Sequence, residues 1–101
     1  MMTNEEINVA VTRRFFTALD TLKKQKVIRG LMTFSERYGY DRRNMVLQRR
    51  ELERDRLRPS WLVHLVEDYK VNPTWLMLGK GDFYMAGFDA EIVKKLQKNR
   101  E

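Results

Sequence analysis

The sequence has no cysteine and few prolines and glycines. Without cysteine the chain can form neither disulfides nor thiolate metal sites, which fits a reducing compartment. No apolar run approaches the roughly 18 residues that a membrane-spanning helix needs, and the N-terminus shows no signal-peptide pattern. We therefore expect a cytoplasmic protein with no membrane partner.

Alternating apolar and polar residues, the pattern of β-strands, are also scarce, whereas apolar residues recur at helical spacing along most of the chain. The 101 residues suffice for one domain, or for one domain with an added terminal helix. No internal repeat or low-complexity tract is present. These observations predict an all-α protein.

Positive charge is abundant, with 20 lysines and arginines against 14 acidic residues and a net charge of +6. This balance favours a polyanionic partner, or serves solubility alone. Arginine is concentrated in one segment, at Arg42, Arg43, Arg49, Arg50, Arg54, Arg56 and Arg58. Because the planar guanidinium matches guanine and phosphate in bidentate contacts, this segment points to nucleic acid.

The N-terminal region predicts a long helix. Thr3 and Glu6 form a T-x-x-E capping box, so the helix should begin near Asn4 and run to about Lys24. One face of it carries apolar residues at spacings of three and four, which are Ile7, Val11, Phe15, Leu19 and Leu22. We expect that face to be part of the core.

Residues 31–50 predict two short helices joined by a tight turn. Leu31, Phe34 and Tyr38 form one apolar stripe, and Gly39 follows where a helix end favours positive φ. Asp41 can then cap the next helix through a backbone N–H of residue 44 or its neighbour. That helix starts at Arg42, and since no Gly or Pro intervenes it could continue to residue 57.

The C-terminal half predicts three more helices. Pro59 allows a new start, with Ser60 as N-cap candidate, for a helix over residues 61–69. Asn72 caps a short helix over 73–78, which ends at Gly79, and Asp89 caps a last helix over 90 to about 98. The apolar residues expected on these helices are Trp61, Leu62, Leu65, Val66, Tyr69, Trp75, Leu76, Leu78, Ile92, Val93 and Leu96.

The segment TFSERYGYDRRNMVLQRR, residues 33–50, resembles the helix-turn-helix of the lambda-repressor-like (Cro/CI, Xre-type) family. The matching positions are the small Ser35, the turn glycine Gly39, Tyr40 after it, and the inward-pointing Met45. RPSWLVHLVEDYKVNPTWLMLGKGDFY, residues 58–84, is similar to the family's fourth and fifth helices, with a tyrosine, V-N-P, W-L and G-x-G in order.

The sequence departs from the family pattern in three ways. Leu31 stands where a phosphate-binding glutamine is common, and Gln48 stands where an apolar residue is expected. The interval from Gly39 to Trp75 is also about two residues longer, which lengthens either the third helix or the loop after it.

The resemblance implies a five-helix lambda-repressor-like domain over residues 1–84, with its helix-turn-helix at about 31–50. Residues 85–101 would form a loop and an additional C-terminal helix. The implied function is sequence-specific binding of double-stranded DNA, as a transcriptional regulator of prokaryotic or phage type. The third helix would enter the major groove, and a homodimer would bind two half-sites.

The resemblance also assigns roles to particular residues. Base edges would be read by Arg42, Arg43, Asn44 and Leu47. Backbone phosphates would be contacted by Arg29, Thr33, Arg49 and Arg50. The best candidates for a dimer contact are Phe88, Ile92, Val93 and Leu96, with Phe83 and Tyr84 beside them. The simpler alternatives are solvated surface charges and a last helix that folds back on its own domain.

Other functions are weighed against DNA binding. A protein-interaction module, such as an antitoxin-like or phage accessory protein, would leave an apolar face exposed after the core is assembled. RNA or single-strand binding would need exposed aromatics, whereas Tyr38 and Tyr40 fit as packing at the turn. His64 is expected on a helix surface, and GKGD lacks the phosphate-loop spacing. We expect no enzyme, no cofactor or metal, and no small-molecule effector.

Overall fold

The computed structural model describes residues 1–99 and is all-helical, as the sequence predicts. No strand occurs in these residues, although one antiparallel bridge joins Val71 to Tyr84. The helices are α1 (Asn4–Lys24), α2 (Leu31–Tyr38), α3 (Arg42–Arg50), the short 3₁₀ helix η1 (Leu52–Arg54), α4 (Pro59–Tyr69), α5 (Pro73–Leu78) and α6 (Ala90–Lys98).

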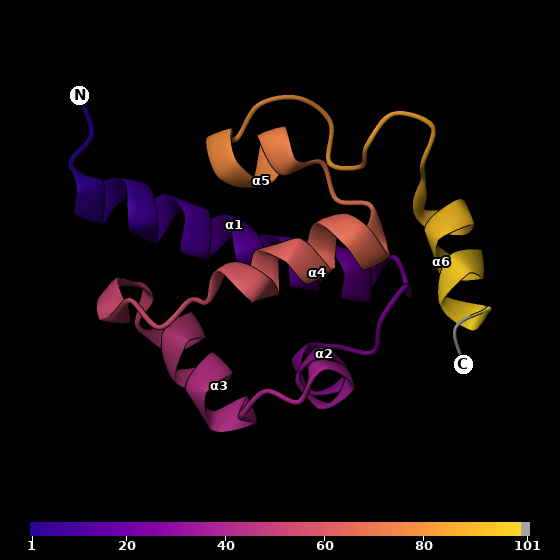
Figure 1. The fold of residues 1–101 in the computed structure, drawn as a ribbon, viewed down its shortest axis with the longest axis horizontal. Helices are drawn as coiled ribbons and strands as arrows, with labels where there is room; N and C mark the ends of the chain where they lie inside the picture. The colour runs from indigo at the N-terminus through magenta and orange to yellow at the C-terminus, as the bar shows by residue number, and fades with distance from the viewer. Residues whose placement is uncertain (100–101) are drawn as a thin grey trace.

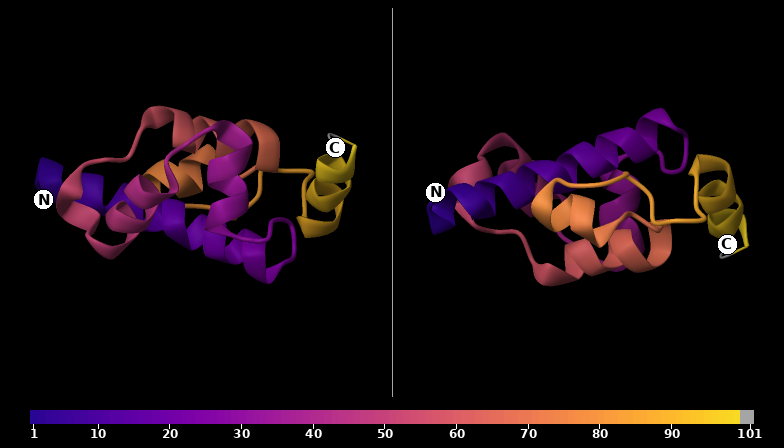
Figure 2. Two further views of the ribbon diagram at one scale, coloured as in Figure 1. Left: turned by 90° about the horizontal axis from the view of Figure 1, so that it is seen from below. Right: turned by 90° about the horizontal axis from the view of Figure 1, so that it is seen from above.

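The long helix α1 is the axis on which the others pack. In Figure 1, α4 and α5 lie along it, α2 and α3 lie below, and α6 stands at the far end from the N-terminus. The two views of Figure 2 show the same order, with α3 and α6 on opposite sides of α2. The helix-turn-helix segment thus forms one edge of the molecule.

The core is centred on Phe15, which is fully buried. Its ring centroid lies 5.0 Å from that of Phe16, 5.6 Å from that of Phe34 and 5.3 Å from that of Trp61. Burying each such side chain contributes roughly 1.5–3 kcal/mol, so this cluster is the main tie between α1, α2 and α4. The predicted core face of α1 is confirmed from Val11 onwards.

Two residues predicted for the core are instead exposed. Ile7 is 45% exposed because the first turns of α1 extend beyond the body of the domain. Leu78 is 64% exposed at the last position of α5, where the helix ends in the left-handed Gly79. Both remain available to a partner.

Four of the predicted helix starts, those of α1, α3, α5 and α6, are set by local side-chain caps. Thr3 and Glu6 form the reciprocal capping box, and Asp41, Asn72 and Asp89 each accept a backbone N–H in the first turn of the following helix. The N-cap prediction for Ser60 was wrong. Pro59 is itself the first residue of α4, and the Ser60 hydroxyl accepts a hydrogen bond from Tyr40 Oη at 2.7 Å.

The turn between α2 and α3 has the predicted form. Gly39 has φ of 73°, a conformation that a residue without Cβ adopts readily. Ser35 and Met45 are buried where the two helices meet, and Ser35 Oγ donates to the Met32 carbonyl at 2.9 Å. That hydrogen bond lies within α2, and packing at the buried Ser35 and Met45 holds α3 against α2.

The last helix folds back on the domain, and Val93 is fully buried in the core. Val93 was therefore wrongly placed among the dimer candidates, because it has no surface to offer. Phe88 is half-buried, with Lys70 Nζ 5.5 Å from its ring centroid. Leu96 is also half-buried, and Ile92 is exposed.

Candidate nucleic-acid interface

The outward face of α3 is fixed by the residues that it buries. Met45 and Gln48 are both fully buried, and an α-helix turns by about 100° per residue. Arg43, Val46, Leu47 and Arg50 consequently lie on the side away from the domain. Arg42 and Arg49 lie on one flank of this stripe.

The outward stripe combines charge with apolar surface. Arg43 is 92% exposed, and its Nε lies 3.8 Å from Asp41 Oδ1. Arg42, Arg43, Val46 and Leu47 together line a shallow surface hollow of about 390 Å³. Val46 was missed by the sequence interpretation, although its position one residue after the inward Met45 places it on the exposed side. The stripe can contact both guanine edges and thymine methyl groups.

Three of the predicted contact residues have partners within the protein, namely Arg43 (with Asp41), Asn44 and Arg49. Asn44 Oδ1 accepts a hydrogen bond from Arg56 Nη1 at 3.2 Å, on the flank of α3 that faces the following loop. Arg49 Nη2 lies 2.7 and 2.9 Å from the two carboxylate oxygens of Asp20 on α1. Because the side chains of both Arg49 and Asp20 are about half exposed, that ion pair contributes little, roughly 0–1 kcal/mol.

The remaining predicted phosphate contacts lie near the start of α2, with Arg50 exposed at the end of α3. Arg29 is exposed and Thr33 half-buried. The N-cap of α2, Gly30, provides no side-chain hydrogen bond, and the first turn has no acidic residue. Such a helix start is electrostatically compatible with an anion. Leu31, at the first position of α2, packs against the core.

Gln48 has a role that the sequence interpretation missed. Its buried amide Nε2 donates to the carbonyls of Glu51 and Leu52, at 3.0 and 3.2 Å, and its Oε1 accepts from the backbone N–H of Arg56. α3 ends at Arg50, so the residues up to α4 form η1 and the loop that Gln48 holds rather than a longer third helix. The sequence did offer a sign of this role, because Gln48 is polar at a position where an apolar residue is expected.

The aromatic residues of the turn are engaged in packing. The rings of Tyr38 and His64 stack with centroids 3.7 Å apart, so His64 is a packing residue rather than a free surface one. Tyr38 Oη donates to Asp68 Oδ2 at 2.5 Å. Burial, together with that hydrogen bond, raises the pKa of Tyr38 well above its usual value. These rings are not presented as stacking platforms for unpaired bases.

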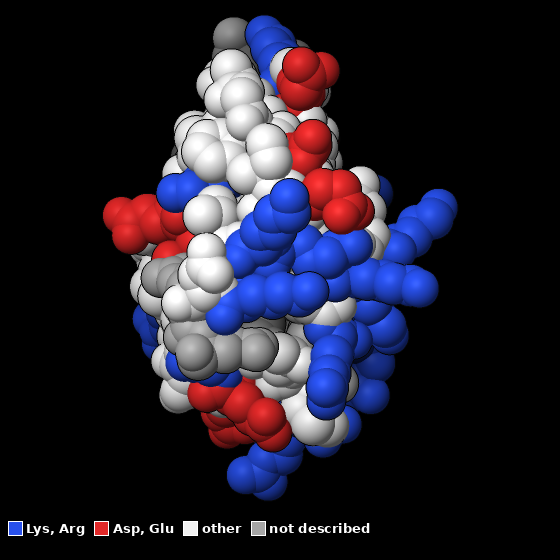
Figure 3. Space-filling view, turned by 90° about the vertical axis from the view of Figure 1, so that its right-hand side faces the viewer, with Lys and Arg blue, Asp and Glu red and all other residues white. Residues whose placement is uncertain are grey.

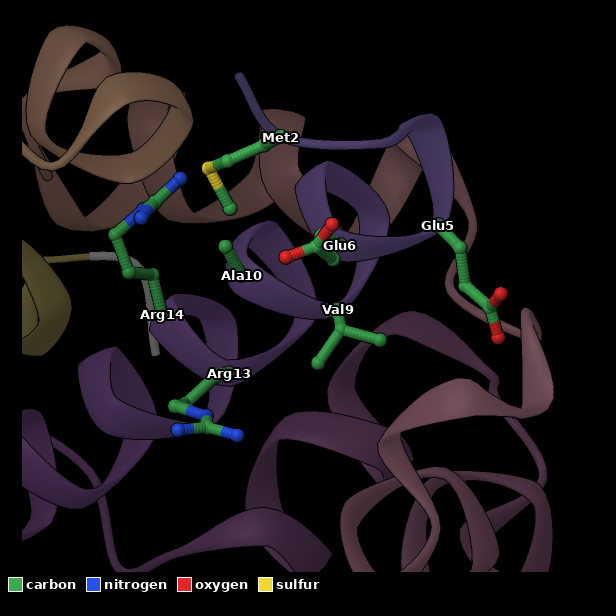
Figure 4. Close-up of a pocket in the computed structure, with 7 residues that line it drawn as sticks. All are labelled: Met2, Glu5, Glu6, Val9, Ala10, Arg13 and Arg14. Carbon is green, nitrogen blue, oxygen red and sulfur yellow. The ribbon is translucent and has the colours of Figure 1, made fainter.

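A second surface feature lies on the N-terminal half of α1. Met2, Ala10 and Arg14 border an open hollow of about 460 Å³, and Figure 4 shows Met2 folded back toward the other two. Arg14 also ties α1 to α5, since its Nε and Nη2 donate to the carbonyls of Leu76 and Met77 at 2.7 and 2.8 Å. The large exposed apolar residues near this end of the chain are Met1, Met2 and Ile7.

Within residues 1–99, no three His, Cys, Asp or Glu side chains are grouped as metal ligands would be. No helix in that range has the length and apolar character to cross a bilayer. Comparisons with models of known protein families, with curated proteins and with solved structures gave no match. Function is therefore inferred from the geometry of the chain itself, together with the sequence resemblance.

Proposed function

We propose that the protein binds double-stranded DNA in a sequence-specific manner, as a prokaryotic or phage transcriptional regulator of the lambda-repressor-like type. The observation that carries the proposal is the outward stripe of α3. Arg43, Val46 and Arg50 are exposed and Leu47 is half-buried along this ridge, because Met45 and Gln48 hold the opposite side of the helix in the domain.

The chemistry of the ridge suits a major groove. Arg43, with Arg42 beside it at the start of α3, reaches guanine O6 and N7 in a bidentate contact worth about 1–3 kcal/mol of discrimination. Leu47 and Val46 contact thymine methyl groups. Arg50 and Arg29 contact phosphates, which position the domain without reading sequence.

A nine-residue helix reads few base pairs, so the proposal includes a twofold dimer on half-sites about one helical turn apart. Ile92 and Leu96 remain as candidates for the contact between copies, because they retain exposed surface. Val93 and the other core residues of α6 do not take part.

The test is selection of bound duplexes from a random pool with the wild type, Arg42→Ala and Arg43→Ala. Arg13→Ala is the matched control, because Arg13 is exposed on α1 and lines the remote hollow. The wild type should enrich a palindromic motif. Each α3 variant should relax the motif at one position and weaken binding about 5- to 150-fold, the equivalent of 1–3 kcal/mol.

Failure of the proposal has a distinct signature. Enrichment of no motif by the wild type, with weak binding that moderate salt abolishes, would indicate non-specific electrostatic attraction only. Unchanged motifs in both α3 variants would show that the ridge does not read bases.

A protein-interaction module is the second candidate, and the exposed apolar residues support it. Met2 just before α1, Ile7 on α1, and Met77 and Leu78 on α5 are all exposed, and α1 and α5 pack together. Sedimentation velocity of the wild type and of Ile7→Lys/Met77→Lys tests whether this surface joins copies of the chain. Association that the double variant abolishes would support it, and monomers at every concentration would exclude self-association there.

A further inference from the structure

The position of α6 is set by a buried polar contact as well as by Val93. Gln97 Nε2 donates to the Asp68 carbonyl at 2.6 Å, and Gln97 Oε1 accepts from Arg37 Nη1 at 2.7 Å. Arg37 Nη1 also donates to Tyr69 Oη at 2.9 Å. These bonds join α6 to α2 and α4, so α6 has one defined rotation against the domain.

That rotation directs Lys94 and Lys98, one turn apart, into a hollow of about 750 Å³ between α6, the end of α1 and the start of α2. The basic residues that line it are Lys23, Lys26, Arg29, Arg37, Lys94 and Lys98. Among the described lining residues only Glu36 is acidic. Figure 3 views the molecule from the α6 side and shows lysines and arginines gathered on this face.

Intramolecular pairing neutralises little of this charge. Lys94 Nζ lies 3.3 Å from Glu91 Oε1, but the carboxylate side chain is 75% exposed, so the pair is weak. Like charges gathered in one concave surface repel one another and raise the local potential. An anion that enters the hollow relieves this repulsion.

The hollow is continuous with the proposed DNA-binding edge. Arg29 and Thr33, which were predicted to contact phosphates, form part of its lining. Figures 1 and 2 show α3, α2 and the C-terminal end of α6 in sequence along one edge of the molecule. A duplex held on α3 and crossing α2 would next meet α6.

We propose that this hollow binds backbone phosphates of duplex DNA that flanks the sequence read by α3. The inference rests on the proposed function and extends it, because it makes α6 a phosphate-binding helix. Lys94 and Lys98 add affinity without adding sequence preference.

The test compares Lys94→Gln/Lys98→Gln with the matched control Lys80→Gln/Lys95→Gln. The control removes the same charge from exposed lysines that do not line the hollow. Affinity is measured by fluorescence anisotropy over a series of salt concentrations. Two duplexes share the selected core sequence, one ending at the core and the other carrying flanks on both sides.

On the flanked duplex, the double variant should reduce the slope of log K against log salt by about 1.8, since each lost phosphate contact removes about 0.9. The change should be much smaller on the short duplex and in the control. The preference for the core sequence should be unchanged. Thermal unfolding checks that both variants remain folded.

The possible failures are distinguishable. Suppose that the wild type binds the core sequence selectively, but Lys94→Gln/Lys98→Gln and the control Lys80→Gln/Lys95→Gln give the same salt slope on the flanked duplex. The inference is then overturned and the proposed function stands. If the wild type selects no duplex, both are overturned. Calorimetric titration with tripolyphosphate tests separately whether the hollow binds a small polyphosphate. Saturable binding that Lys94→Gln/Lys98→Gln abolishes, with duplex slopes unchanged, would assign the hollow to a small polyphosphate and overturn the inference.

Discussion

Replacement of Gln48 by leucine tests whether one buried amide determines the end of α3 and the course of the loop after it. The substitution keeps a side chain of similar size and restores the apolar type that the family resemblance leads one to expect at this position. It removes the hydrogen bonds to the carbonyls of Glu51 and Leu52 and from the N–H of Arg56. The backbone of residues 51–56 then loses its partner.

The magnitude follows from these three bonds. Each contributes roughly 0.5–1.5 kcal/mol net, and the introduced leucine recovers part of the loss through apolar burial. Because the loop is at the surface, water can also reach some of the freed groups. We expect a loss of about 2–3 kcal/mol in the free energy of unfolding, which lowers Tm by about 10–20 °C in a domain of this size.

The assay is urea and thermal unfolding followed by circular dichroism, with Val46→Ala as the control. Val46 is exposed on the same helix and should change stability by less than about 0.5 kcal/mol. A Gln48→Leu variant as stable as the wild type would refute the reasoning, because the loop would then keep its conformation without the hydrogen bonds of Gln48.

Gln48→Glu adds a pH-dependent test of the same contact. The introduced carboxylate would face two carbonyl oxygens in a buried site, which raises its pKa in the folded state above the unfolded value near 4.3. A raised folded pKa means that stability is retained at low pH and lost as the pH rises through that range. The deficit relative to the wild type should therefore be small near pH 4 and grow toward pH 7. A deficit independent of pH would contradict the geometry.

Three further predictions concern stability. Arg14→Met should lower the free energy of unfolding by about 1–2 kcal/mol by freeing the last carbonyls of α5, with Arg13→Met as the near-neutral control in urea unfolding. The pKa of Glu6 is lowered by a hydrogen bond from the backbone N–H of Thr3 and, to a smaller extent, by one from the Thr3 side chain. The stabilisation by the capping box is therefore fully present above pH 4.5 and is lost as the pH falls below it. Tm measured from pH 3 to 6 should show a weaker acid dependence in Glu6→Gln. Burial, with a smaller effect of the Asp89 charge, raises the pKa of Tyr84 to about 12, so stability should fall as the pH rises from 10 to 12, and Tyr84→Phe should reduce that fall in alkaline unfolding curves.

The starts of α1, α3, α5 and α6 were predictable from the sequence because their causes are local. Thr3 with Glu6, Asp41, Asn72 and Asp89 each lie within three residues of the N–H group that they accept. Gly39 likewise ends α2 through its own backbone conformation. In each case the two interacting groups are close in the sequence, so the residue types and their spacing predict the interaction.

The features that sequence reasoning missed depend on contacts between distant segments. α3 ends at Arg50 without any Gly or Pro, because Gln48 holds the following backbone in a different course. Val93 is buried by helices that lie far from it in the chain. The basic hollow is assembled from α1, α2 and α6, and no local pattern joins Lys26 to Lys94 or Lys98.

The buried residues of α3 also determine which of its arginines face outward and can contact bases. Arg49 lies one turn after Met45, on the flank that faces α1, and this position explains its contact with Asp20. Arg43 and Arg50 lie nearly opposite Met45, with Val46 and Leu47 between them. Within the proposed function, the exposed stripe centred on Arg43 therefore supplies the base contacts. Arg49 must leave the carboxylate of Asp20 before it can contact a phosphate. Because that exposed ion pair is weak, breaking it costs little free energy.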